Sequence, residues 1–247
     1  MKIRAIILSA LILCGISAVI MYSRAAQPQQ KSSVITQAIN DKNTPMVIKN
    51  LILKMKEQME VNDDQFPELI KEVENYTNSC ADSASVAVLH SMLAEMYQNY
   101  YQRNQWTINQ RTQLSGYIPE DIRVWTSNLF TDKIKEEIDL SLRPTALLQN
   151  APVSKFKDIL EIGKDSQTLR PTLYEFLAFR ALDIQPTVQI YKDLIAFQNK
   201  EPNMKSVLLT ELDYLRFLYG DKRDKESFEA YMNALDELYR NLASQNY

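Results

Sequence analysis

Apolar residues recur at spacings of three and four positions from about Val34 to the C-terminus, and proline, glycine or clusters of Asn and Asp interrupt this pattern repeatedly. Such spacing is typical of amphipathic α-helices, and the interruptions mark where one helix ends and the next begins. The pattern therefore predicts an all-α fold made of helical hairpins. We expect the hairpins to form a tetratricopeptide-like solenoid or an irregular bundle.

The first predicted helices have recognisable starts. Thr44 is suited to cap a helix whose first position is Pro45, and Pro67 opens the next helix. The most regular apolar stripe runs from about 84 to 101, so this helix is expected to be central to the core. In the second half, Asp121 is predicted to cap a helix in which Trp125 faces inward. The helices expected there cover 122–142, a segment from Pro171, 188–198, 207–219 and 225–243.

The N-terminus has the features of a targeting segment. Lys2 and Arg4 precede an uncharged apolar run at 5–22, and Ser23 and Ala25 supply small residues at the −3 and −1 positions of a cleavage site. We interpret residues 1–25 as a secretory signal peptide. Residues 26–43 are then a polar linker with a short first helix, and residues 44–247 are an α-helical domain.

Two alternatives to cleavage remain open at this segment. The apolar run is about as long as a bilayer-spanning helix, so the segment could stay as a membrane anchor. Cys14 could instead be lipidated, although Leu13 stands where a lipoprotein signal peptidase prefers a small residue. In each case the chain is expected to be exported to the periplasm or cell envelope, with membrane contact only through the N-terminal segment.

Charge and composition limit both the class of partner and the class of fold that we expect. The formal net charge is −3, and removal of the leader would take away three cations and no acid. An acidic surface repels phosphate backbones, so we expect no nucleic-acid partner. With 4 Gly and 9 Pro in 247 residues, the chain also has too few turn-formers for a many-stranded β-fold.

The residues offer no recognisable catalytic constellation. His90 is the single histidine, and its helical neighbours are apolar, which favours a hydrogen-bonded core or edge residue over a catalytic one. Cleavage of the leader would leave Cys80 without a disulfide partner. Glu136 and Glu137 are interpreted as coating a solvated face. We therefore expect no enzyme activity, no cofactor and no metal site.

One stretch, 97–112, is unusual in composition, because aromatic rings alternate with amides and arginines. Such a surface can bind a sugar or a partner protein. The rings can equally pack while their polar neighbours tie down the connection around Gly116 and Pro119, which would make a structural clasp. The residues that we single out as a possible partner surface or structural clasp are Tyr101, Trp106, Arg111, Asp121 and Trp125.

Four ordered motifs, at 89–97, 100–112, 121–126 and 169–183, resemble the N-terminal helical region of Bacteroidetes-type bacterial alpha-2-macroglobulin family proteins. In that family the region precedes macroglobulin β-domains, a bait region and a thioester domain, which trap or sense proteases at the cell envelope. No such β-domain is apparent in this sequence. Cys80 is followed by Ala81-Asp82-Ser83, and not by the Glu and Gln that a thioester requires, so the resemblance transfers no trapping chemistry to this chain.

The resemblance implies a non-catalytic helical scaffold or interaction module, truncated or freestanding, that docks or spaces a protein partner in the cell envelope. The alternative is a membrane-anchored or periplasmic tetratricopeptide-like adaptor that binds a protein or peptide in a groove.

Overall fold

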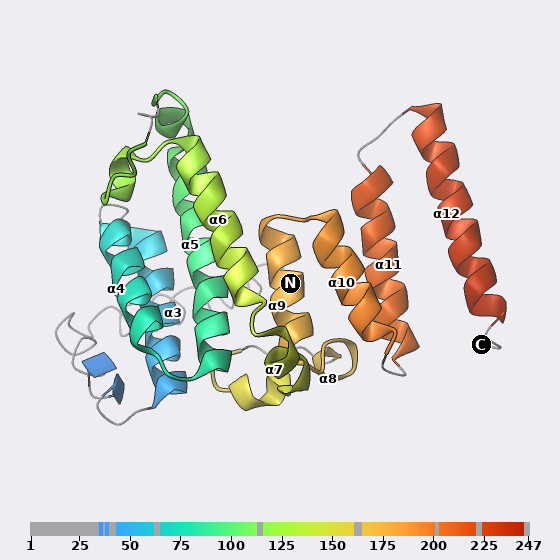
Figure 1. Ribbon diagram of the computed structural model, residues 1–247, viewed down its shortest axis with the longest axis horizontal. Helices are drawn as coiled ribbons and strands as arrows, with labels where there is room; N and C mark the ends of the chain where they lie inside the picture. Colours follow the sequence, from blue (N-terminus) through green and yellow to red (C-terminus); the bar gives the residue numbers. More distant parts are fainter. Residues whose placement is uncertain are drawn as a thin grey trace, which may run out of the picture. The chain divides into compact units, whose positions relative to one another are not determined.

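The computed structural model describes residues 35–36, 38–39, 43–61, 65–112, 116–160, 165–200, 203–220 and 224–244, and their regular structure is helical (Figure 1). An isolated bridge between Pro152 and Thr172 accompanies the helices. The all-α prediction is thus confirmed for these residues. The α-helices are α3 (Thr44–Val61), α4 (Phe66–Ser79), α5 (Ser83–Ile108), α6 (Ser127–Ser141), α7 (Thr145–Asn150), α8 (Ser166–Leu169), α9 (Leu173–Ile184), α10 (Val188–Gln198), α11 (Met204–Tyr219) and α12 (Lys225–Ser244), with 3-10 turns η2 (Ile122–Val124) and η3 (Val153–Phe156).

The chain divides into two compact units, 1–57 and 58–247, and the division falls within α3. In the first unit, the apolar stripe of α3 is buried, as its spacing predicts. The helix is capped by Asn43, whose side-chain oxygen accepts a hydrogen bond from the Met46 backbone N–H at 3.2 Å. The cap is therefore one residue before the predicted Thr44.

The second unit begins with the antiparallel pair α4 and α5. Pro67 lies in the first turn of α4, as predicted, and Asp82 caps α5 by accepting from the Ser85 N–H at 2.9 Å. Helix α5 continues to Ile108, well past the predicted end at 101. Tyr100 and Ile108 extend its buried face, so the polar residues between them occupy the solvent side of a longer helix.

The predicted continuous helix over 122–142 is wrong at its start. Asp121 caps only the short turn η2, by accepting from the Arg123 N–H, and Trp125 and Thr126 are extended before α6 begins at Ser127. The break has a physical cause, because an extended Trp125 can direct its ring into the core while its indole N–H reaches a loop carbonyl.

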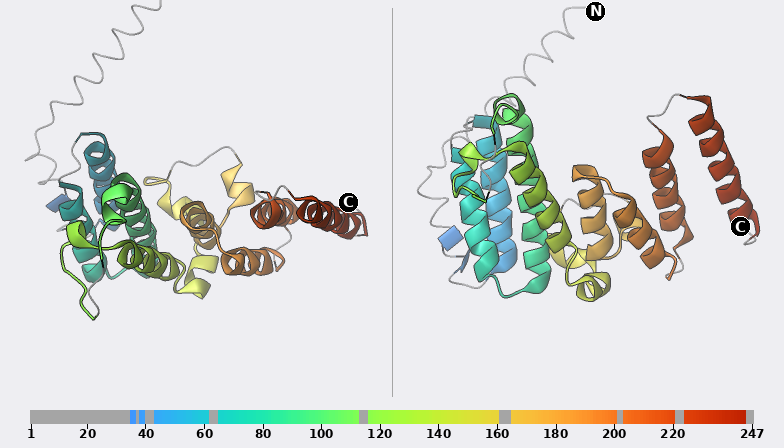
Figure 2. Two further views of the ribbon diagram at one scale, coloured as in Figure 1. Left: turned by 90° about the horizontal axis from the view of Figure 1, so that it is seen from above. Right: turned by 45° about the horizontal axis from the view of Figure 1, so that its top comes forward.

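Helices α9 to α12 each pack against the next in chain order, and α9 also contacts α5 and α7. Both turned views show α11 and α12 side by side (Figure 2). Arg180 of α9 links the two halves of this unit: its guanidinium donates to Ser91 Oγ at 2.9 Å and to Glu95 Oε2 at 2.6 Å, both on α5.

A buried polar network joins α8, α9, α10 and α11. Thr172 and Glu175 form a reciprocal capping box at the start of α9. Gln198 of α10 donates to Glu175 Oε1 at 3.2 Å and to Ser206 Oγ at 2.6 Å, and Ser206 donates in turn to the Leu169 carbonyl at 2.7 Å. Most of the polar atoms in this network are therefore satisfied inside the core.

No helix in the described ranges has the length and apolarity needed to cross a membrane. The interpreted leader, 1–25, and the first part of the linker lie outside the described residues.

Candidate functional site

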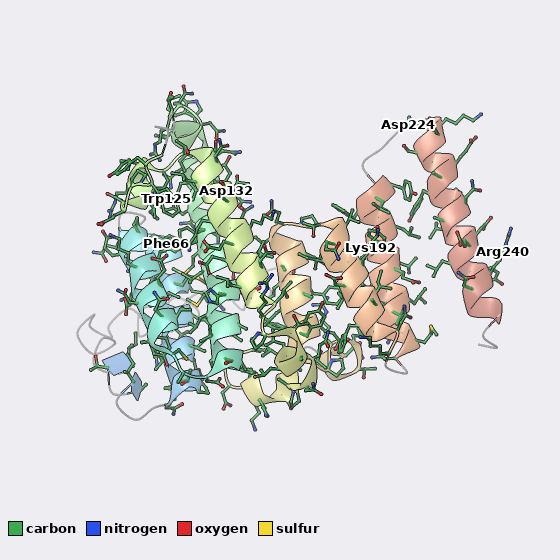
Figure 3. The ribbon with its side chains drawn as sticks, in the orientation of Figure 1. Phe66, Trp125, Asp132, Lys192, Asp224 and Arg240 are labelled. Carbon is green, nitrogen blue, oxygen red and sulfur yellow. The ribbon has the colours of Figure 1, made fainter. Side chains whose placement is uncertain are left out.

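Trp125 anchors the loop between α5 and α6 on the core. Its side chain is 8% exposed, and its ring stacks on Tyr97 with centroids 5.7 Å apart. The indole N–H donates to the Pro119 carbonyl at 2.7 Å, and the Trp125 carbonyl accepts from Arg111 Nη1 at 2.7 Å. Trp125 and Phe66 lie toward the same end of the α4–α5 pair (Figure 3). Arg111 and Trp125 therefore hold the two sides of the connection together.

The ring of Tyr97 packs directly against the ring of Trp125. Its hydroxyl donates to Glu74 Oε1 at 2.6 Å, and burial together with this acidic partner raises the pKa of Tyr97 far above its usual range. The phenol thus remains a hydrogen-bond donor at any physiological pH. The aromatic cluster in contact here comprises Phe66, Tyr97, Tyr100, Tyr101, Trp125 and Phe130.

The other sequence-predicted candidates occupy different settings. Tyr101 is half-buried; its ring stacks on Phe130 at 5.8 Å, and its hydroxyl donates to Asn109 at 3.3 Å. Asp121 pairs with Arg123, which also binds Glu68. A hydrogen bond from the Arg123 backbone N–H, aided by the guanidinium, lowers the pKa of Asp121.

Trp106 does not take part in the clasp. Its side chain is 79% exposed, so of the two alternatives for the 97–112 stretch, packing in a clasp does not hold for this residue. The cause is the extension of α5 to Ile108, which carries Trp106 on the solvent side of the helix. Tyr117, Ile118 and Val124 are also exposed large hydrophobic residues near the α5–α6 connection.

His90 has a carboxylate partner that the sequence analysis did not find. Its Nδ1 lies 2.6 Å from Glu137 Oε2, and Lys133 Nζ lies 2.8 Å from Glu137 Oε1. Burial raises the pKa of Glu137, but hydrogen bonds from His90 and Lys133 outweigh this and hold that pKa below its usual range. Since the carboxylate is ionised, the imidazole Nδ1 carries the proton and donates.

The interpretation of Glu137 as a solvated residue is wrong, because only 2% of its side chain is exposed. Glu136, in contrast, is exposed as expected. The signal was available in the sequence: Glu137 lies seven positions after buried Phe130 and three after buried Ile134, on the apolar stripe of α6.

The His90–Glu137–Lys133 group has the geometry of a buried ionic tie between α5 and α6. In the described part of the chain, no cluster of His, Cys, Asp and Glu side chains is arranged to hold a metal ion. Cys80 is half-buried, and its thiol lies 3.9 Å from the Asp82 carbonyl.

A cleft of about 880 Å³ opens between α6 and α7 on one side and α9 and α10 on the other. Its floor is apolar and buried, and is formed by Ile138, Tyr174, Ile190 and Phe197. Its rim is exposed and polar. Figure 1 shows α6 and α10 on either side of α9, with α7 near the lower end of α6.

The rim of this cleft carries more cations than acids. Lys135, Arg143 and Lys200 line it, and none of these side chains makes an ion pair or hydrogen bond with another described residue. The lining acids are Asp139 and Asp193, and Asp193 accepts a hydrogen bond from Gln189 at 2.8 Å.

Tyr174 reaches this cleft from α9. Its buried ring makes an edge contact with Phe197 at 5.2 Å. Its hydroxyl has no hydrogen-bond partner among the residues that the structure describes. Burial, with a smaller effect from Asp193, raises the pKa of Tyr174 to about 12, so the hydroxyl is a neutral donor at pH 7.

A second groove of about 670 Å³ lies between α10, α11 and α12. Lys192, Glu211 and Glu237 are its charged lining residues, and burial raises the pKa of Glu211. Sequence reasoning singled out no residue of either groove, because each is assembled from separate helices.

No family model, curated protein or solved structure that was compared with the chain matches it.

Proposed function

We propose that this chain is an exported, non-catalytic helical interaction module of the cell envelope, and that it docks a protein partner in the cleft between α6 and α10. The cleft is the observation that carries the proposal. It combines a buried apolar floor with an exposed polar rim, which is the usual construction of a recognition site. The proposal favours binding in a groove, as in the adaptor alternative.

A non-catalytic role is supported by how the reactive residues are used. His90 and Glu137 are bound to each other and to Lys133 inside the α5–α6 interface, where Glu137 is almost fully buried. A general base must reach a proton on its substrate, and this carboxylate faces its own helix pair. The group is therefore assigned to stability.

The relation to alpha-2-macroglobulin-type proteins stays part of the proposal. What supports it is that residues of the matching motifs contact one another: Arg180 binds Ser91 and Glu95, and the Trp125 ring stacks on Tyr97. Such residues would be retained for packing. The proposed solenoid is supported by the packing of each helix from α9 to α12 against the next.

Site-directed photo-cross-linking tests the proposal. A benzoylphenylalanine in place of Gln189, an exposed cleft residue, should cross-link one defined protein in envelope preparations of the source cells. The control carries the same probe in place of Asn128, which is exposed on α6 and lines neither groove. Equal labelling from both positions, or none from either, would contradict docking in the cleft.

A further inference from the structure

We infer that the cleft between α6 and α10 binds an extended, acidic peptide segment of its partner. The inference rests on the proposed function and adds the chemistry of the ligand. It is carried by three features of the described residues: unpaired cations on the rim, free amides beside them, and an aromatic floor with an unused hydroxyl.

The charge of the rim is opposite to that of the chain. Lys135, Arg143 and Lys200 outnumber Asp139 and Asp193, whereas the whole protein has a net charge of −3. The three cations make no ion pair among the described residues, so a ligand carboxylate would not have to displace an internal partner. Charge-assisted hydrogen bonds to such cations are about twice as strong as neutral ones.

The shape of the cleft favours an extended chain. Its lining runs from Gln189 at the start of α10 to Lys200 just beyond its end. The 11 residues of α10 span roughly 16 Å at about 1.5 Å per residue. An extended peptide rises about 3.3 Å per residue, so about five residues would fill this length.

Amides can pair with the main chain of such a peptide. The side chains of Gln149 and Gln185 line the cleft and make no hydrogen bond with other described residues. A carboxamide offers both a donor and an acceptor, which matches a peptide group. The apolar floor at Ile190 and Phe197 can accept one hydrophobic side chain, and the Tyr174 hydroxyl can donate to a carboxylate.

Peptide binding to the full chain tests the inference. The probe is fluorescein-labelled Glu-Glu-Phe-Glu-Glu, measured by fluorescence anisotropy, with Gln-Gln-Phe-Gln-Gln and Lys-Lys-Phe-Lys-Lys as controls. We expect the acidic peptide to bind at least about tenfold more tightly than either control. Its affinity should fall as salt is added, because the rim is exposed.

Matched variants locate the binding. Arg143→Gln with Lys200→Gln should weaken binding of the acidic peptide by about tenfold or more. Lys192→Gln should change it less than about twofold, since Lys192 lies on α10 but lines the second groove. Figure 3 shows Lys192 on the side of α10 toward α11. Tyr174→Phe keeps the buried ring and should cause a smaller loss.

Several outcomes would overturn the inference. The inference is wrong if acidic and neutral peptides bind equally well. It is also wrong if the acidic peptide binds the Arg143 and Lys200 double variant as tightly as it binds the wild type. If no peptide binds but the probe at Gln189 still cross-links a partner, the acidic-peptide inference fails and the proposed function stands. If both experiments are negative, both fail.

Discussion

At the scale of single residues, identical side chains have opposite roles according to their place on a helix or turn. Trp106 and Trp125 are the two tryptophans of the chain. One projects into solvent, and the other is packed against Tyr97 and Phe130 and hydrogen-bonded to Pro119. Trp125 therefore belongs to the structural clasp, and Trp106 belongs to the exposed surface.

We predict that Trp125→Ala lowers the free energy of unfolding by about 3 to 5 kcal/mol, because it leaves a cavity beside Tyr97 and removes the indole N–H that donates to the Pro119 carbonyl. Trp106→Ala should change that free energy by less than about 0.5 kcal/mol. Denaturant titrations measure both. If both variants unfold like the wild type, the clasp assignment is wrong, and the aromatic stretch should be treated as a binding surface.

The Glu137 carboxylate should make stability depend on pH. Its folded-state pKa is lowered, so its contribution is present above the unfolded-state pKa, about 4.3, and is lost as pH falls through the lower folded value. Glu137→Gln should therefore destabilise the fold at pH 7, by about 1 to 3 kcal/mol. The difference from wild type should shrink below about pH 4.

The neighbouring residue supplies the control. Glu136 is exposed and shares the Lys133 ammonium, so Glu136→Gln should have little effect at pH 7. Thermal melts of both variants between pH 7 and pH 3 measure the difference. A Glu137→Gln protein that melts like the Glu136→Gln protein at pH 7 would show that the buried tie to His90 is unimportant for stability.

At the scale of elements, the helices are joined by polar links as well as by apolar packing. Arg180 connects α9 to α5, and the network around Glu175 connects α8, α9, α10 and α11. Because α10 forms a wall of both grooves, its attachment to α9 and α11 decides their shape. A defect in this network should therefore affect binding as well as stability.

We predict that Glu175→Ala lowers the free energy of unfolding by about 2 to 4 kcal/mol, since it removes the side-chain acceptor of the Thr172 N–H and one of the two acceptors of the buried Gln198 amide. Glu226→Ala is the matched control, because Glu226 is also in the first helical turn of its element but is exposed. That variant should lose less than about 0.5 kcal/mol. Similar losses in the two variants would contradict the prediction. They would show that Glu175 contributes no more than an ordinary carboxylate in the first turn of a helix.

At the scale of the whole molecule, the proposed docking role requires export. The cationic start, the apolar run at 5–22 and the small residues before Ala26 are its only support. These residues lie outside the described ranges, so the argument stays with the sequence.

We predict that the native protein is recovered with the cell envelope and that its mass corresponds to a chain starting at Ala26. Intact-mass spectrometry of protein purified from the source cells measures this. A chain starting at Met1 in the membrane fraction would establish the anchor instead, and a lipid-modified Cys14 would establish the lipoprotein. Recovery of unprocessed protein from the cytosol would contradict all three.

The sequence alone determined the long helices and several of their boundaries, because the three-and-four spacing and the capping residues act within a few positions of one another. The short helices α7 and α8 were not predicted. A helix was predicted around 188–198, where α10 lies, and Trp125 was correctly expected to face inward. The failures came where the chain departs from one regular helix. The extension of α5 exposed Trp106, and the break before Ser127 confined the cap at Asp121 to a short turn.

Tertiary structure alone decided which helix faces meet. Glu137 is on the apolar stripe of α6, but only its approach to His90 on α5 makes a buried charge tolerable. The cleft likewise combines Lys135 and Arg143 from one part of the chain with Gln189 and Lys200 from another. Periodicity records which positions face inward on one helix and contains no information about the partner helix, so neither the ionic tie nor the cleft could be read from it.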